Sequence, residues 1–274
     1  MNRDQLAYWN GPVGEIWASH REAMDRGLAE AGGALLAWAA PQIGERVLDI
    51  GCGSGTVTLL LAERVGREGR VTGLDISRPM LAGARPRSGS VRFIEGDAAV
   101  FPFAPDHDLI ASRFGVMFFA DPVAGFANIR KALAPSGRLA FICWRDVEEN
   151  EWAMLPFRAA KPHLPPQPSS DPRAPGPFAF ADVDYLRAVL GGAGFTAVRI
   201  AKFDGEMEVG ATPEEASFRV THLIGPTARA LRNAGEDQRT KAAAAVRDAF
   251  IRLQQERGGG AVRPGIACWL VEAR

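Results

Sequence analysis

The sequence predicts an α/β protein with a mostly parallel sheet and helices on both faces. Between residues 44 and 143, short apolar runs alternate with segments whose apolar residues recur at helical spacing. A glycine-rich bend follows the first apolar run, and the second run ends in an aspartate. Strands that alternate with helices form right-handed crossovers, so the strands are expected to run parallel.

The first half of the chain supplies five strands and three helices to this fold. Thr56–Val65 is predicted to be a helix because apolar residues stand at positions 57, 60, 61 and 65. A second helix begins within Pro79–Ala84, and a third spans Val123–Leu133. The predicted strands are Arg46–Ile50, Arg70–Asp75, Val91–Glu95, Leu109–Ser112 and Arg138–Trp144.

The second half adds two strands and two insertions. Residues 146–180 are rich in proline, which favours a surface loop or lid over a long regular element. Ala181–Gly192 is predicted to be a helix and Phe195–Phe203 a strand. Thr212–Arg257 is predicted to be mostly helical, and Gly265–Val271 forms the final strand. We therefore expect a helical lid at 1–43 and one ligand-binding domain at 44–274, with insertions at about 146–180 and 205–262.

Composition limits the classes of function. The 274 residues contain 32 basic and 32 acidic side chains, a balance that does not predict nucleic-acid binding. No apolar run approaches the roughly 20 residues that cross a bilayer, and the first residues do not resemble a signal peptide. The cysteines Cys52, Cys143 and Cys268 are scattered, which favours a reducing cytoplasm and gives no metal-ligand spacing. We expect a cytoplasmic protein without a metal; its oligomeric state stays open.

The clearest signal is the segment Asp49-Ile50-Gly51-Cys52-Gly53-Ser54-Gly55. Glycines permit a tight bend and close approach of a ligand to the backbone, at the strand end where α/β sheets bind ligands. The dinucleotide pattern fails here because the sixth position from Gly51 is Thr56, and no P-loop lysine follows. Asp49 would repel a pyrophosphate and suit a cationic group. The remaining alternative is a tight turn without a ligand.

Two further acids follow the next strands. Asp75 ends the second strand and could accept both hydroxyls of a ribose, or could instead cap the following helix. Asp97, followed by Ala98, comes after the third strand and could accept an adenine amino hydrogen; an ordinary turn aspartate is the alternative. Together with the glycine bend, these acids predict a nucleoside site.

These segments, in this order, resemble class I S-adenosylmethionine-dependent methyltransferases, and most of all the ubiquinone/menaquinone-biosynthesis group. The acidic glycine loop matches the family pattern without departure over Asp49–Gly55. Asp75 and Asp97-Ala98 match its ribose and adenine contacts. Leu133-Ala134-Pro135-Ser136-Gly137 resembles the turn before the fifth strand, with Ser136 in place of a glycine. The resemblance is strong over roughly 44–145 and rests on topology alone over 181–274.

The resemblance implies a Rossmann-like, seven-stranded sheet in the order 3-2-1-4-5-7-6, with the last strand antiparallel. It implies S-adenosyl-L-methionine as the cofactor. Carried over by position, Asp49 and Gly51 hold the methionine end, with Gly53 and Gly55 completing the loop. Asp75 holds the ribose, Ile76 packs on the adenine, and Asp97 and Ala98 contact its edge. The Ser112 backbone and Phe114 line the pocket near the sulfonium.

The aromatic N-terminus is a further candidate for the cofactor site. In related methyltransferases such a segment covers the cofactor, and aromatic faces attract cations such as a sulfonium. Tyr8, Trp9 and Trp17 are therefore predicted to line the site, although plain packing of a lid helix is the alternative. We expect the two insertions to form the roof over a small, apolar or aromatic methyl acceptor.

The catalytic residues are left unassigned. Methyl transfer is a direct displacement at carbon, so alignment supplies much of the catalysis, and a base is needed only where the acceptor must lose a proton. His222 and His20 are the candidates for that base. Arg113, just after the fourth strand, could bind a carboxylate or phosphate of the acceptor.

Three other functions compete with a small-molecule methyltransferase. A nicotinamide-dependent oxidoreductase is disfavoured by Asp49 and by the missing sixth-position glycine. A non-catalytic methyltransferase-like binding module is disfavoured by the unbroken cofactor loop. A nucleic-acid methyltransferase is disfavoured by Ser112-Arg113-Phe114-Gly115, which lacks the Asn/Asp-Pro-Pro-Tyr/Phe type of motif, and by the charge balance.

Overall fold

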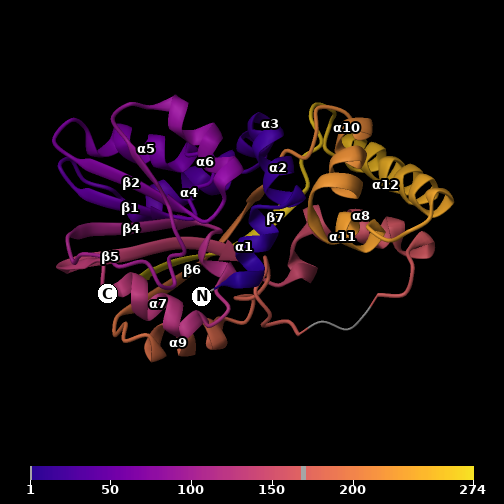
Figure 1. The fold of residues 1–274 in the computed structure, drawn as a ribbon. Coiled ribbons are helices and arrows are strands. Elements are labelled where there is room, and N and C mark those ends of the chain that lie inside the picture. The colour runs from indigo at the N-terminus through magenta and orange to yellow at the C-terminus, as the bar shows by residue number, and fades with distance from the viewer. Residues whose placement is uncertain (1, 168–170) are drawn as a thin grey trace.

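The computed structural model, which describes residues 2–167 and 171–274, is built on one seven-stranded sheet. The strand order is β3-β2-β1-β4-β5-β7-β6; β7 runs antiparallel to both of its neighbours, and the other pairings are parallel. The predicted fold class and strand order are confirmed (Figure 1). The strands are β1 (Arg46–Ile50), β2 (Arg70–Asp75), β3 (Arg92–Glu95), β4 (His107–Arg113), β5 (Leu133–Trp144), β6 (Val198–Glu206) and β7 (Gly265–Ala273).

Strand boundaries after β2 differ from the prediction, and the largest differences are in β5 and β6. β5 begins at Leu133 because Leu133 pairs with His107, so the preceding helix α7 (Pro122–Arg130) ends three residues before it was expected to end. β6 begins at Val198, three residues late, because the Phe195 N–H donates to the Leu190 carbonyl (3.1 Å) and closes the end of the preceding helix. The first shift comes from pairing with a strand distant in sequence, and the second from the local bond that closes the helix before β6.

Helices cover both faces of the sheet. In Figure 1, α4 (Ala29–Ala39), α5 (Thr56–Val65) and α6 (Arg78–Ala84) lie on one face, and α7 and α9 (Val183–Gly192) on the other. The sheet centre is buried from both sides, and Leu48, Leu109 and Phe141 are at most 2% exposed. Asp121 and Asp182 cap α7 and α9 by accepting backbone N–H groups of the first turn. This packing holds the carboxyl ends of β1, β2 and β4 at one edge.

The segment before β1 is helical. It consists of α1 (Arg3–Trp9), α2 (Pro12–Ser19) and α3 (Arg21–Gly27), followed by α4. The last of these, α4, packs against β4 and β5, so it belongs to the layer that covers the sheet. The first three reach across the carboxyl edge of the strands (Figure 1). The division into a lid at 1–43 and a domain at 44–274 stays a prediction.

The insertions form a helical layer beside the sheet, seen with α8, α10, α11 and α12 in Figure 1. The expectation of a proline-rich loop was wrong for the start of the first insertion, because most of its prolines come after residue 160 and α8 forms before them, with Pro156 inside it. Residues 168–170 of this insertion lie outside the described part. The layer contains η3 (Val147–Glu149), α8 (Glu151–Ala160), η4 (Lys161–His163), α10 (Pro213–Phe218), the π-helical turn η5 (Arg219–Leu223), α11 (Gly225–Leu231) and α12 (Glu236–Glu256).

Two short 3₁₀ turns, η1 (Arg85–Arg87) and η2 (Val116–Phe118), complete the described elements. Over residues 2–167 and 171–274, every helix is too short or too polar to span a membrane.

Candidate functional site

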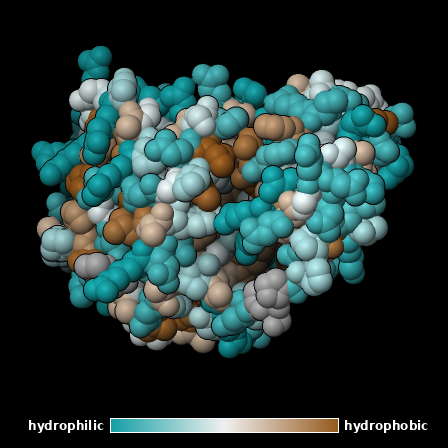
Figure 2. Space-filling view, turned by 45° about the vertical axis from the view of Figure 1, so that its right-hand side comes forward, coloured by the Kyte–Doolittle hydropathy of each residue, from teal (hydrophilic) through white to brown (hydrophobic). Residues whose placement is uncertain are grey.

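A cavity of about 910 Å³ opens at the carboxyl edge of the sheet. Its wall comes from the loops after β1, β2, β3 and β4, from the N-terminal helices and from the helical layer of the insertions. In Figure 2 the surface is hollowed near the centre of the view, with hydrophobic residues along part of the margin. A ligand in this cavity would contact both the sheet edge and the insertions.

The glycine loop forms one wall of this cavity. Gly51 and Gly53 have φ values of +68° and +55°, a left-handed backbone that favours glycine. A Cβ at Gly51 would lie 2.6 Å from the Gly115 Cα, and a Cβ at Gly53 would lie 2.6 Å from the Met80 Cε. The loop is therefore shaped by close backbone approach. Gly55 (φ +84°) starts α5 and packs on Phe93, behind the cavity surface.

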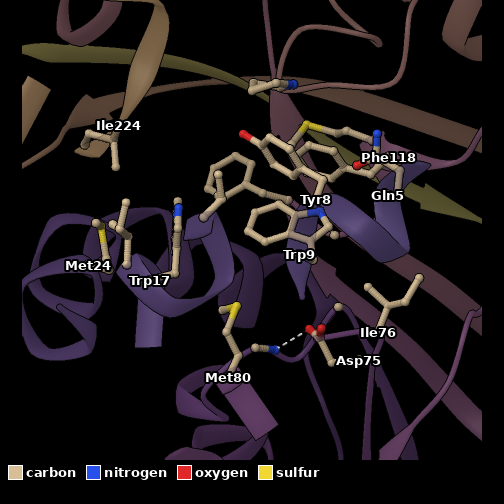
Figure 3. Close-up of a pocket in the computed structure, with 18 of the residues that line it drawn as sticks. Gln5, Tyr8, Trp9, Trp17, Met24, Asp75, Ile76, Met80, Phe118 and Ile224 are labelled. Atoms are coloured by element: carbon tan, nitrogen blue, oxygen red, sulfur yellow. Dashed lines mark hydrogen bonds between the residues drawn. The ribbon is translucent and has the colours of Figure 1, made fainter. Parts of the chain in front are cut away.

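Asp75 lies beside this loop and lines the cavity. Its Oδ2 accepts the Gly53 N–H at 2.7 Å, the dashed line at Asp75 in Figure 3, and its Oδ1 accepts the Ser77 N–H at 2.7 Å. Burial raises the pKa of this carboxyl above its ordinary value, while the two N–H groups oppose that rise. Carboxylate oxygens have further lone pairs, so Asp75 can hold the loop and still accept ribose hydroxyls.

Asp97, Ala98 and Ile76 also line the cavity. Asp97 is engaged by the N-terminus, since its Oδ2 accepts the Asn2 backbone N–H at 2.9 Å and its Oδ1 accepts the Asn2 side-chain amide at 3.2 Å. The Asn2 Oδ1 in turn accepts the Ala120 N–H at 2.7 Å. Any adenine amino group at Asp97 would therefore share this carboxylate with the start of α1.

Asp49 and Ser112 lie behind the cavity wall and are not part of its surface. The Thr58 hydroxyl donates to Asp49 Oδ2 at 2.7 Å, and the Ser112 hydroxyl donates to the Ile50 carbonyl at 2.7 Å. Burial raises the pKa of Asp49 to about 7, which the bond from Thr58 and the charge of Arg113 limit only in part. Direct contact of these two residues with a cofactor stays a prediction.

The aromatic residues of the N-terminus lie over the opening. Tyr8, Trp9 and Trp17 all line the cavity, and Trp9 packs edge-on against both Trp17 and Phe118 (Figure 3). The Ser77 hydroxyl donates to the Trp9 carbonyl at 2.8 Å, so the end of α1 is fixed to the loop after β2. The three side chains thus belong to the cavity wall, and their contact with a cofactor stays a prediction.

A second aromatic row lines the side of the cavity toward the insertions. Phe114 adopts a left-handed backbone (φ +63°) and stacks on Trp144 with ring centres 4.2 Å apart and an interplanar angle of 6°. Trp144 contacts Trp152, which stacks in turn near Phe178. We call Phe114, Trp144, Trp152 and Phe178 the aromatic wall. The left-handed backbone of Phe114 is strained for a residue other than glycine, and such strain persists only where the surrounding structure enforces it.

The three candidates for catalysis or acceptor binding differ in position. His222 lines the cavity from the π-helical turn η5, whereas His20 ends α2 outside the wall, with its Nδ1 3.0 Å from the Ile16 carbonyl. Arg113 lines the cavity, but its guanidinium lies 3.9 Å from Asp25 and 3.4 Å from the Leu28 carbonyl. Burial lowers the pKa of Arg113, and Asp25 and Asp49 oppose that change. The structure thus favours His222 over His20.

The charges of the cavity suit a cationic nucleoside at the sheet edge. Four aspartates line this region: Asp4, Asp25, Asp75 and Asp97. A sulfonium and an ammonium are attracted by such a surface, and a diphosphate is repelled by it. The acids, the tight glycine loop and the cavity therefore fit S-adenosylmethionine.

Sequence reasoning missed most of the wall that the insertions supply. Trp152, Arg229, Arg232 and Arg239 line the cavity, and no local motif marks them. Trp144 had a usable signal, because it ends β5 at the same sheet edge as the glycine loop. The others reach the cavity only through the packing of α8, α11 and α12.

Comparison with known proteins finds a family model that matches the first part of the domain. Residues 47–137 match the family model described as a methyltransferase domain. A 2-phytyl-1,4-naphtoquinone methyltransferase from Thermosynechococcus vestitus is 38% identical over 109 residues, covering 38% of this chain and 48% of the relative. An aklanonic acid methyltransferase from a Streptomyces species is also 38% identical, over 108 residues, covering 37% and 49%.

A solved structure shows a similar fold. Phosphoethanolamine N-methyltransferase 2 from Haemonchus contortus, solved with S-adenosyl-L-methionine, has a TM-score of 0.58 at 17% identity, covering 100% of this chain and 60% of that one. The chain spans about half the length of the curated relatives that it matches. The predicted resemblance to methyltransferases is confirmed over residues 47–137, and the solved structure agrees with the predicted fold.

Proposed function

We propose that this protein is an S-adenosylmethionine-dependent methyltransferase that methylates a small, largely apolar molecule, because residues 47–137 match a methyltransferase domain. One observation carries the proposal most directly. The Asp75 carboxylate and the Gly53 backbone meet at 2.7 Å on the wall of a cavity large enough for a cofactor and an acceptor together.

Bound S-adenosylmethionine supplies a methyl group on a positively charged sulfur. The chain's own residues would hold the nucleoside between Asp75, Ile76 and Ala98, and would cover it with Trp9 and Trp17. The aromatic wall would hold the acceptor flat and exclude water. Such positioning lowers the barrier to displacement, because the two reacting groups are already aligned.

His222 can take the proton from an acceptor hydroxyl. The Thr221 hydroxyl donates to the Ser217 carbonyl at 2.6 Å, so its oxygen accepts from His222 Nδ1 at 2.9 Å. The Phe218 carbonyl, 3.1 Å away, is a second acceptor for the same Nδ1–H. This network assigns the proton to Nδ1 and leaves the lone pair on Nε2 for a base.

The acceptor is proposed from the wall and from the relatives. The curated relatives are named for a naphtoquinone and for aklanonic acid. From the second insertion, Leu223 and Ile224 add apolar surface beside the aromatic wall. These features support a ring-containing or otherwise apolar acceptor, methylated on oxygen, carbon or nitrogen.

Calorimetry separates this function from the alternatives. We expect S-adenosylmethionine to bind and NADH not to bind. Asp75→Ala should weaken S-adenosylmethionine binding about 100-fold, since hydrogen bonds to a charged group contribute about 1.5–3 kcal/mol. Asp184→Ala, on the exposed side of α9, is the matched control. Unchanged affinity in Asp75→Ala, or tight NADH binding, would contradict the assignment.

A screen of acceptors separates an enzyme from a binding module. Purified protein, S-adenosylmethionine and a set of quinones, phenols and carboxylic acids are incubated, and methylated products are sought by mass spectrometry. Cofactor binding without any product across such a set would favour the non-catalytic module.

A further inference from the structure

Three arginines line the end of the cavity formed by the helical layer. Arg229 belongs to α11, Arg232 follows its last residue, and Arg239 lies in the first turn of α12. All three are exposed at the cavity wall. We call them the arginine rim.

The rim arginines lack acidic partners. Over residues 2–167 and 171–274, no carboxylate oxygen lies within 4.0 Å of a guanidinium nitrogen of Arg229, Arg232 or Arg239. The one side-chain hydrogen bond of the group runs from Arg239 Nη2 to the Arg232 carbonyl (2.8 Å), and it ties the start of α12 to the end of α11. The fold therefore gathers like charges without neutralising them.

The charges at the two ends of the cavity are opposite. The cofactor end carries Asp4, Asp25, Asp75 and Asp97. The two other arginines that line the cavity, Arg21 and Arg113, lie beside the carboxylates of Glu22 and Asp25. The rim carries only positive charge, and the aromatic wall contributes apolar surface to the same cavity. A cation is favoured at the first end, and an anion at the second.

We propose that the methyl acceptor is anionic, with an apolar body against the aromatic wall and a carboxylate or phosphate group at the arginine rim. Guanidinium groups bind both anions through paired N–H donors, so these two groups share one recognition chemistry. This inference rests on the proposed function and specifies its substrate. The sequence analysis suggested Arg113 as the residue that binds an anionic group of the acceptor. We assign that role to the arginine rim instead, because aspartates already balance the charge of Arg113.

Matched small probes test the rim without knowledge of the acceptor. Calorimetry on protein saturated with S-adenosylhomocysteine compares 2-naphthoate, 2-naphthyl phosphate and the neutral 2-naphthamide. We expect at least one anionic probe to bind about tenfold more tightly than the amide, and the tighter of the two anions identifies the anionic group. The preference should vanish in Arg229→Gln/Arg232→Gln and persist in Arg64→Gln/Arg67→Gln, which alters exposed arginines of and just after α5.

Each result has a defined meaning. Equal binding of anion and amide, no binding of any probe, or a preference that survives in the rim variant would overturn the proposal. A loss of S-adenosylhomocysteine affinity in the rim variant would overturn it as well, because the arginines would then hold the cofactor carboxylate. If S-adenosylhomocysteine fails to bind the unaltered protein, the proposed function itself fails.

Discussion

The two ends of the cavity are built in different ways. At the cofactor end, short loops leave neighbouring parallel strands and bring Gly51, Asp75 and Asp97 together from segments that are local in sequence. At the acceptor end, α8, α11 and α12 come from two distant insertions and supply aromatic and basic side chains. The first end thus depends on the strand order of the sheet, whereas the second depends on how the inserted helices pack.

We expect the largest effect from a substitution that disrupts the cofactor end alone. Gly51→Ala places a Cβ 2.6 Å from the Gly115 backbone at a φ of +68°, so the loop must move. We expect binding of S-adenosylhomocysteine to weaken at least about 100-fold, since strain of this kind costs about 1–3 kcal/mol before any loss of ligand contact. Calorimetry measures the loss.

Gly66→Ala is the matched control for that change. Gly66 has a φ of +70°, but no atom lies within 4 Å of the added Cβ. It should lower stability and leave cofactor affinity unchanged. Equal loss of binding in both variants would show that backbone strain, and not the shape of the loop, determines affinity.

A change at His222 should affect the acceptor end alone. With an acceptor hydroxyl found by the screen, His222→Gln should lower kcat about 100-fold, at the lower limit for loss of a general base. Affinity for S-adenosylhomocysteine should change by less than about threefold. His163→Gln in η4, outside the cavity wall, is the control. An unchanged kcat in His222→Gln would remove this residue from the mechanism.

The sheet and the cofactor end could be predicted from sequence because their signals are local. The bend Asp49–Gly55 needs glycine for its backbone, and the pattern of β1 and β2 matched the structure residue for residue. The acceptor end could not be predicted in this way. Arg229 and Trp152 reach the same cavity only because α8 packs against α11. Nothing in the local sequence of either helix predicts that packing.

The predicted cofactor motif also did not indicate which of its side chains face the cavity. Asp49 belongs to the predicted cofactor motif, yet it lies buried against Thr58. Its pKa of about 7 exceeds its ordinary value of 3.8, so between these values the folded state binds a proton that the unfolded state has lost. Asp49 therefore lowers stability as pH rises, by up to about 1.4 kcal/mol per unit, and adds no further slope above pH 7.

Replacement of Asp49 tests this charge directly. Relative to Asp49→Asn, the unfolding free energy of the unaltered protein should fall by about 2 kcal/mol from pH 5 to pH 7 and then stay level. Urea unfolding at fixed pH values measures the difference. Parallel curves for the two proteins would show that Asp49 is already ionised at pH 5.

The smallest expected effect concerns the aromatic wall. Phe178→Ala should weaken binding of neutral 2-naphthamide about tenfold, as expected from the loss of about 1.4 kcal/mol of apolar contact. Phe203→Ala, in β6 and outside the cavity wall, removes an equally half-buried ring and serves as control. Equal effects of the two changes would place the probe somewhere other than the aromatic wall.

A crystal structure with S-adenosylhomocysteine tests the division of the cavity most directly. We expect the ribose hydroxyls at Asp75, the sulfur facing Phe114 and Trp144, and the arginine rim free of the cofactor. A nucleoside bound among the helices of the insertions, or a cofactor carboxylate held by Arg229 or Arg232, would contradict this division.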